Sequence, residues 1–186
     1  LLLIVWTINS TPAPTVHAQT TKLVATLFGE NRVDLPPVSR IFLEDLFSKI
    51  NDIELDVAPY ELDHLCYRVE SFEQYKSKKE ELLHHGEMLI ESMVNGRMIA
   101  TFKLFEPIVY QKRKIYLLEL PAPKPGHAYP AGLEHVEFVT KGPLQKIIDR
   151  YPQYSFEAFG IHKKINADIT LKLGDYCIRF HNQSLE

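Results

Sequence analysis

The chain has 186 residues, of which 45% are hydrophobic and 24% are charged, and its formal net charge is -3 at pH 7. This size fits one domain or two small modules that share a core, and the composition is that of an ordinary globular protein. The small negative charge lacks the basic footprint of nucleic-acid binding, and it gives no electrostatic reason for attraction to an anionic membrane. We therefore expect no nucleic-acid partner.

The first 37 residues show no sustained hydrophobic period, and we expect 1–37 to form an extension outside the folded domain. The apolar run at 1–6 is far too short to span a bilayer. Val16-His17-Ala18 has the small-residue pattern of a signal-peptide cleavage site, whereas the sequence as given lacks the positively charged start of such a signal. Two interpretations stand, a poorly ordered upstream extension or the remnant of a secretory signal. We favour the first, together with a cytoplasmic location.

A helix is predicted after Leu35-Pro36-Pro37, which we expect to stop any helix and so to separate the extension from a domain at 38–186. Large apolar residues recur at helical spacings as far as Ile50, and the helix should end near Asn51. Ser39 is the expected N-cap.

Module one, at about 60–120, is predicted to contain one helix and four strands. In chain order these are a strand at 63–69, a helix at 71–85, and strands at 88–90, 98–105 and 114–120. Gly86 should end the helix. Asn95-Gly96 predicts a hairpin, and Glu106-Pro107 is expected to break its second arm.

A linker at 121–132, rich in proline and glycine, leads to module two at about 133–186. This module repeats the order, with a strand at 134–139, a helix at about 143–151, an extended stretch at 154–159, and strands at 167–173 and 176–181. We therefore predict an α+β fold in which paired βαβββ modules form a curved mixed sheet around a cleft, with an N-terminal helix.

The two modules share a motif in which an acid precedes a histidine at the start of a strand, Asp63-His64 and Glu134-His135. If the modules lie side by side, residues at the first and last strand of each should converge. In module one these residues are His64 and Glu119, and in module two they are His135 and His181. Three imidazoles and one carboxylate form a plausible shell for a divalent metal such as Zn, Ni, Mn or Fe(II).

Residues at every second position along the same strands share the same face, and they include Arg68, Glu137 and Arg179. A buried arginine is costly unless it is paired, so Arg68 and Arg179 either pair with Glu137 or bind a carboxylate or phosphate of a substrate. Glu137 is either such a structural partner or a catalytic base beside the metal. Cys66 and Cys177 are interpreted as small buried hydrophobes in a reducing compartment.

Several short motifs follow one another in a fixed order, namely Asp63-His64, Asn95-Gly96-Arg97, Phe102-Lys103-Leu104, Glu106-Pro107, Glu119-Leu120-Pro121, Tyr129-Pro130, Glu134-His135-Val136-Glu137 and Phe180-His181. Over roughly residues 38–184 they resemble the YecM-type proteins of the vicinal oxygen chelate superfamily, which includes glyoxalase I, extradiol dioxygenases and bleomycin-resistance proteins. The resemblance implies paired βαβββ modules and a metal held by the first and last strands, hence by His64, Glu119, His135 and His181. Superfamily enzymes often have a Glu at the last of these positions, and a site without His181 would remain workable.

These observations favour a metal-dependent enzyme acting on a small oxygenated or carboxylate-bearing molecule, with Glu137 as the proton shuttle. Isomerase, lyase, hydrolase and dioxygenase chemistry all stay open, because a fold does not choose a reaction. A non-catalytic module that binds or sequesters a small molecule is the alternative. A structural protein with internal His and Glu pairs is a third interpretation. We expect no membrane span, and a homodimer is compatible with the sequence.

Overall fold

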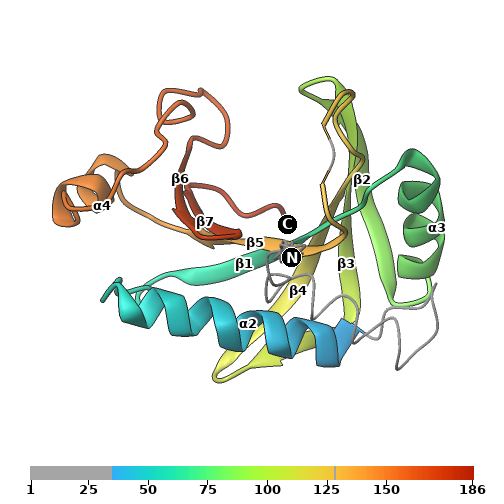
Figure 1. Cartoon of the computed structure of the whole chain (residues 1–186), viewed down its shortest axis with the longest axis horizontal. Helices are drawn as coiled ribbons and strands as arrows, with labels where there is room; N and C mark the ends of the chain where they lie inside the picture. The colour runs from blue at the N-terminus through green and yellow to red at the C-terminus, as the bar shows by residue number, and fades with distance from the viewer. Residues whose placement is uncertain (1–34, 128) are drawn as a thin grey trace, which may run out of the picture.

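The computed structural model describes residues 35–127 and 129–186, so the expected extension lies almost wholly outside the described residues. The elements are α2 (Leu35–Asp52), β1 (Glu61–Arg68), α3 (Phe72–Leu82), β2 (Gly86–Val94), β3 (Arg97–Tyr110), β4 (Arg113–Pro121), β5 (Gly132–Val139), α4 (Gln145–Arg150), β6 (Asp168–Leu173) and β7 (Tyr176–His181). The strands form one seven-stranded mixed sheet in the order β2-β3-β4-β1-β5-β7-β6, which curves without closing (Figure 1). The predicted α+β class with an N-terminal helix is confirmed.

Helix α2 begins at Leu35, earlier than the predicted start at Val38. Pro36 and Pro37 fall in its first turn, where a backbone N–H has no intrahelical acceptor and the fixed φ of proline suits a helix. The two prolines therefore open the helix, and the prediction that they stop it was wrong. Ser39 was also wrong as the N-cap, because it lies buried within the helix.

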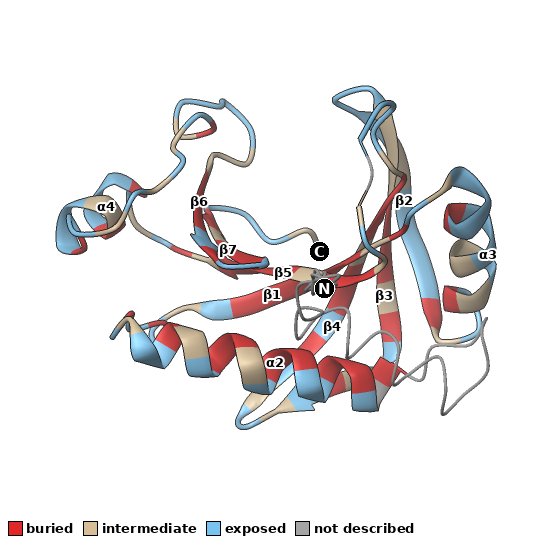
Figure 2. Ribbon diagram, in the orientation of Figure 1, coloured by how far each residue is buried: buried red, intermediate tan, exposed pale blue. Residues whose placement is uncertain are grey.

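The hydrophobic core lies between α2 and one face of the sheet. The ring of Phe47 meets that of Phe138 on β5 at 6.5 Å, and the ring of Phe42 meets that of Tyr176 on β7 at 5.1 Å. Figure 2 shows buried residues along α2 and through the central strands. Because side chains alternate along a strand, the residues between those of the core project from the opposite face of the sheet.

Module one follows the predicted order. Ser71 caps α3 by accepting a hydrogen bond from the backbone N–H of Gln74 at 3.1 Å. Asn95 and Gly96 take φ values of 48° and 80°, and they form the predicted hairpin turn between β2 and β3. Glu106-Pro107 does not end β3, contrary to prediction, because a shift in its register with β4 between Lys103 and Ile108 absorbs the proline.

Module two departs from the predicted order in one place. The stretch at 154–159 is not a strand, and its backbone pairs with the sheet through an isolated bridge between Glu157 and Thr170. Tyr154 instead donates its hydroxyl to the carbonyl oxygen of Ile53 at 2.6 Å, which holds the segment against the end of α2. Module two thus supplies three strands to the sheet and module one supplies four.

The first strands of the two modules pair with each other and lie at the middle of the sheet. β1 runs antiparallel to β5, and each has the last strand of its own module as a parallel neighbour, β4 and β7 respectively. Side chains from both modules therefore meet at the β1–β5 junction. No helix among the described residues combines the length and apolar character that crossing a membrane requires.

We expect Gly86→Ala to destabilise the fold by about 2 kcal/mol, because overpacking a tight site costs on this order. A Cβ at Gly86 would lie 2.4 Å from the backbone carbonyl oxygen of Lys103 on the paired strand. Urea denaturation followed by circular dichroism would measure the change. Gly142→Ala is the matched control, since a Cβ there meets only the Thr140 hydroxyl at 4.0 Å. Equal midpoints for the two variants would contradict the close approach of β2 and β3.

Candidate metal centre

Two adjacent cross-strand rows of side chains occupy the middle of the sheet, on the face opposite α2. In one row, His64 of β1 is paired with Glu137 of β5. In the next row, Cys66 of β1 lies between Glu119 of β4 and His135 of β5. His64 and His135 are only 1% and 2% exposed. The pairing of strands thus gathers imidazoles and carboxylates from both modules in a buried place.

A β-bulge in β1 places Asp63 beside His64. β1 pairs Leu62 with Phe138 and His64 with Glu137, so Asp63 is an extra residue with no partner in the register. A bulge interrupts the alternation of side chains, which lets two successive residues approach the same region. Asp63 Oδ2 lies 2.8 Å from His64 Nδ1. The carboxylate accepts from Nδ1–H and leaves Nε2 as the free ring nitrogen.

A second bulge, in β5, repeats this arrangement around His135. Here Cys66 pairs with His135 and Tyr67 with Leu133, so Glu134 is the extra residue. Its Oε2 is hydrogen-bonded to His135 Nδ1. Burial opposes ionisation of Glu134, but His135, Arg68 and Arg179 together outweigh it and lower the pKa of Glu134 to about 2. Each histidine is thus oriented by the carboxylate that precedes it in the sequence.

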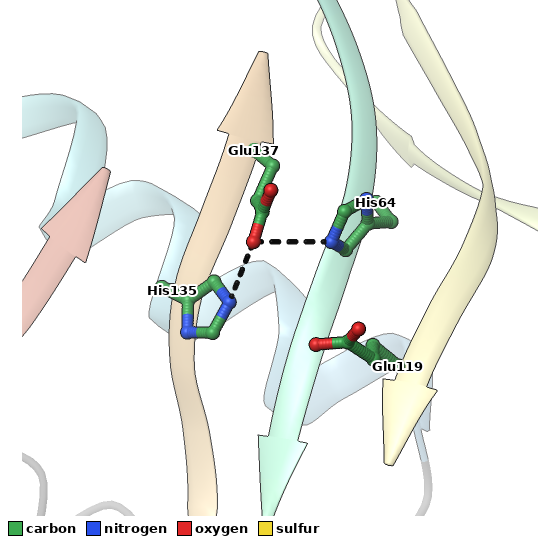
Figure 3. A group of neighbouring side chains, drawn as sticks. All are labelled: His64, Glu119, His135 and Glu137. Carbon is green, nitrogen blue, oxygen red and sulfur yellow. Dashed lines mark hydrogen bonds and ion pairs between the residues drawn. The ribbon is translucent and has the colours of Figure 1, made fainter. Parts of the chain in front are cut away.

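This arrangement directs the two Nε2 atoms toward Glu137. Its Oε1 lies 3.2 Å from His135 Nε2 and 3.5 Å from His64 Nε2 (Figure 3). Glu119 points to the same place from β4, and the ligand atoms of His64, Glu119, His135 and Glu137 all lie within 4.8 Å of one another. Three of these residues were predicted as metal ligands, and Glu137 was predicted as either the partner of an arginine or a catalytic base.

The group is strongly coupled electrostatically. Burial opposes a charge on His64, but the Glu137 carboxylate and the bond to Asp63 outweigh it and raise the pKa of His64 to about 9. Burial likewise opposes ionisation of Glu137, whereas His64 and His135 hold the pKa of that carboxyl well below its usual range. The site therefore favours positive charge next to Glu137, from protons or from another cation.

The four side chains fit a divalent metal ion. Two imidazole nitrogens and two carboxylate oxygens suit Zn, Mn, Ni or Fe(II). The Nε2 atom of His64 is buried and has no hydrogen-bond partner among the described residues, so the neutral ring would offer its lone pair there. Ligands about 2.0–2.2 Å from one ion lie at most about 4.4 Å apart, so only a small adjustment of the four side chains would be needed. The carboxylate behind each imidazole is the support that metal-binding histidines usually have.

The structure does not bring His181 into this group. Glu119 lies opposite Cys66, two residues beyond His64, and the matching position in module two lies opposite Glu137, two residues beyond His135. That position is Arg179, not His181. Module two therefore carries a guanidinium where module one carries a carboxylate. His181 lies two residues after Arg179 on β7, and its Nε2 is 3.7 Å from Asp63 Oδ2.

The two arginines take different places. Arg179 Nη1 lies 3.0 Å from Glu137 Oε1, which is one of the two arrangements predicted for it. Arg68 Nη2 lies 3.0 Å from Glu134 Oε1, and its guanidinium stacks over the ring of Tyr129 at 4.6 Å. Arg179 thus forms an ion pair with Glu137, a member of the group, whereas Arg68 forms one with Glu134, which orients His135.

The two cysteines flank His135 across neighbouring strands. His135 pairs with Cys66 on one side and with Cys177 on the other, so the Cα atoms of the two cysteines are separated by two strand spacings, about 10 Å. That separation excludes a disulfide between them. Both are free and buried, and burial raises the pKa of the Cys66 thiol. This matches their interpretation as packing residues.

Three residues have a role at the site that was not predicted. Asp63 and Glu134 were predicted only as part of the repeated motif, because strict alternation along a strand would point their side chains away from the histidines. The third is Ser184, whose hydroxyl donates to Asp63 Oδ1, while the backbone N–H of Leu185 donates to Asp63 Oδ2 at 3.2 Å. The acid before each histidine was the signal that could have identified the first two.

Comparison with known proteins agrees with this architecture. An uncharacterized protein of Haemophilus influenzae is 32% identical over 130 residues, which cover 67% of this chain and 68% of that protein. Protein YecM of Escherichia coli is 28% identical over 163 residues, 78% of this chain and 85% of its own length. A solved structure described as structural-genomics protein EC4020 has a TM-score of 0.68 at 24% identity, covering 89% of both chains.

A more distant likeness is to a methylmalonyl-CoA epimerase of Streptomyces coelicolor, with a TM-score of 0.49 at 12% identity over 68% of this chain and 98% of the epimerase. The family model described as YecM protein matches residues 35–186, which is the whole of the described domain. The chain belongs to the YecM family.

Proposed function

We propose that this protein is a divalent-metal-dependent enzyme acting on a small oxygenated or carboxylate-bearing molecule. The observation that carries the proposal is the buried group of His64, Glu119, His135 and Glu137, in which a carboxylate orients each imidazole from behind. Buried imidazoles and carboxylates without a cation are costly, and a strand scaffold holds them in place. When bound, the ion would act as a Lewis acid on a substrate oxygen.

We assign Glu137 to the metal ligands, in place of the catalytic base suggested by the sequence. Its carboxylate lies between two imidazoles and a guanidinium, which keep its pKa far below neutrality. A carboxylate in such surroundings accepts a proton poorly, since an efficient general base has a pKa near the operating pH. The same position suits an ionised ligand, because cations already surround it.

Arg179 is the residue that we propose for substrate binding. Its Nη1 binds Glu137, its side chain remains 30% exposed, and its Nε has no hydrogen-bond partner among the described residues. A partly exposed guanidinium next to the metal group suits a carboxylate or phosphate on the substrate. Arg68 was expected in the same role, but we propose that it acts through Glu134 and so positions His135.

A non-catalytic binding module with the same metal group is the second candidate. The low pKa of Glu137 favours it, because that carboxyl is then too weak a base for proton transfer. In both cases the free, buried cysteines suit a reducing compartment, and we retain the cytoplasm as the proposed location.

Replacing ligands should abolish metal binding at this group. We expect His135→Ala and Glu119→Gln each to weaken the affinity of this group for metal at least about tenfold, and so to lower the metal content, since each removes a direct ligand. Elemental analysis of purified, dialysed protein measures the metal, and the exposed His84→Ala is the control with unchanged content. Equal metal in all variants would reject the site. Turnover of α-keto, hemithioacetal, catechol and ester compounds by the loaded protein then separates an enzyme from a binding module.

Removing the carboxylate behind a ligand should have a smaller effect. Glu134→Gln keeps the size of the side chain but removes the charge that orients His135, and such changes weaken metal binding about 10- to 100-fold. Competition with a chromophoric chelator would measure the affinity. Glu157→Gln, far from the group on the β6 edge, should leave the affinity unchanged. An unaltered affinity in Glu134→Gln would show that Glu134 does not support the site.

Metal binding should release protons. His64 in the metal-free protein has a pKa of about 9 and is therefore protonated at pH 7, whereas a ligand imidazole must be neutral. Affinity should rise about tenfold per pH unit for each proton displaced, up to about pH 9, and then level off. Calorimetry in buffers of different ionisation enthalpy counts the protons at pH 7. A binding reaction that releases none would contradict the charged state of His64.

A further inference from the structure

His181 is the imidazole that the metal group leaves unused, and its surroundings define its tautomer. It is fully buried at the end of β7. Its Nδ1 lies 3.1 Å from Asn166 Oδ1 and 3.8 Å from Glu137 Oε2. Both neighbours are hydrogen-bond acceptors, so Nδ1 carries the hydrogen, and in the neutral ring Nε2 carries the lone pair.

That lone pair faces a carboxylate. His181 Nε2 lies 3.7 Å from Asp63 Oδ2, and it has no hydrogen-bond partner among the described residues. A protonated Nε2 would not satisfy the pair either, because 3.7 Å is too long for an N–H···O bond. A buried nitrogen without a hydrogen bond therefore faces a carboxylate oxygen that already accepts from His64 and Leu185, and leaving that nitrogen unsatisfied is costly.

We propose that Asp63 and His181 form a second cation site, separate from the group around Glu137. Two ligands each about 2.0–2.2 Å from one ion lie up to about 4.4 Å apart, so the separation of 3.7 Å fits one ion between them. One imidazole nitrogen and one carboxylate oxygen suit a borderline dication such as zinc better than calcium, which prefers oxygen ligands alone. Ligand atoms of Asp63, His64 and His181 lie within 4.8 Å of one another.

The second ion would join parts of the chain that are not neighbours in the sheet. Asp63 is on β1 and His181 ends β7, with β5 between them. Asp63 also accepts hydrogen bonds from Ser184 and Leu185, so the ion would fasten the residues after β7 to the central strand. Asp63 would thus be a ligand of the second ion and, through its hydrogen bond to His64, would also orient a ligand of the first ion. Binding at one site should therefore alter affinity at the other, and the effect must be reciprocal.

Metal stoichiometry tests the proposal. We expect the full chain to bind about two equivalents of Zn²⁺, and His181→Asn to bind about one, as measured by calorimetric titration and elemental analysis. Asparagine places an amide near the position of Nδ1, which keeps a donor for Asn166 while removing the Nε2 ligand. Gln183→Ala, at the exposed neighbouring position after β7, is the control and should still bind two.

The His135→Ala variant keeps the test independent of the proposed function. It lacks a ligand of the first group but keeps Asp63 and His181, so it should retain about one equivalent, which the additional change His181→Asn removes. A single equivalent in the wild type that His135→Ala abolishes would overturn the second site, as would two equivalents in His181→Asn. A single equivalent that depends on His181 and survives His135→Ala would instead overturn the first group and uphold the second. If His181→Asn does not fold, the content of His135→Ala alone decides, and a value of zero rejects the second site.

Discussion

Two β-bulges are the constraint on which the site depends. In a regular strand the residue before a histidine faces the opposite side of the sheet, here the hydrophobic core beneath α2. A carboxylate forced into that core would be costly. The bulges at Asp63 and Glu134 remove one residue from each side of the β1–β5 pairing and let both carboxylates reach the imidazole that follows them. The core and the polar group can therefore occupy the two faces of the same strands.

The duplicated modules are not used symmetrically. In module one, the residue two positions after His64 is Cys66, and its partner on the last strand of the module is Glu119, so this row holds a thiol and a carboxylate. In module two the corresponding row contains Glu137 and Arg179, so the carboxylate has moved to the first strand of the module and a guanidinium stands on the last. Both modules still supply one imidazole and one carboxylate to the group. As a result, the carboxylate of module two comes from its first strand, as Glu137 on β5. Its last strand, β7, adds the positive charge of Arg179 instead.

Much of this could be predicted from sequence because the signals are local. The repeated acid-His motif located the two central strands, Asn95-Gly96 located a hairpin, and the apolar run of β4 placed Glu119 among buried residues. The register between strands is a tertiary property, so the choice between Arg179 and His181 could not be made from spacing within one strand. The bulges were invisible for the same reason, since an alternating pattern assumes that none is present. The second module's edge segment at 154–159 has strand-like composition, yet its tyrosine binds the end of α2 instead.

The charges of the group indicate what kind of molecule it could hold. Glu119 and Glu137 bring two negative charges, and Asp63 and Glu134 behind the imidazoles bring two more. Arg68 and Arg179 bring two positive charges, and neutral imidazoles add none. With a dication in place under the proposed function these charges would balance, so the choice of ligand would rest on local contacts. Arg179 is paired with Glu137 and keeps a partly exposed side chain, so it could give an anionic oxygen a second partner besides the ion. Under the proposed function, the position of this guanidinium therefore favours a carboxylate or enolate-forming compound over an uncharged one.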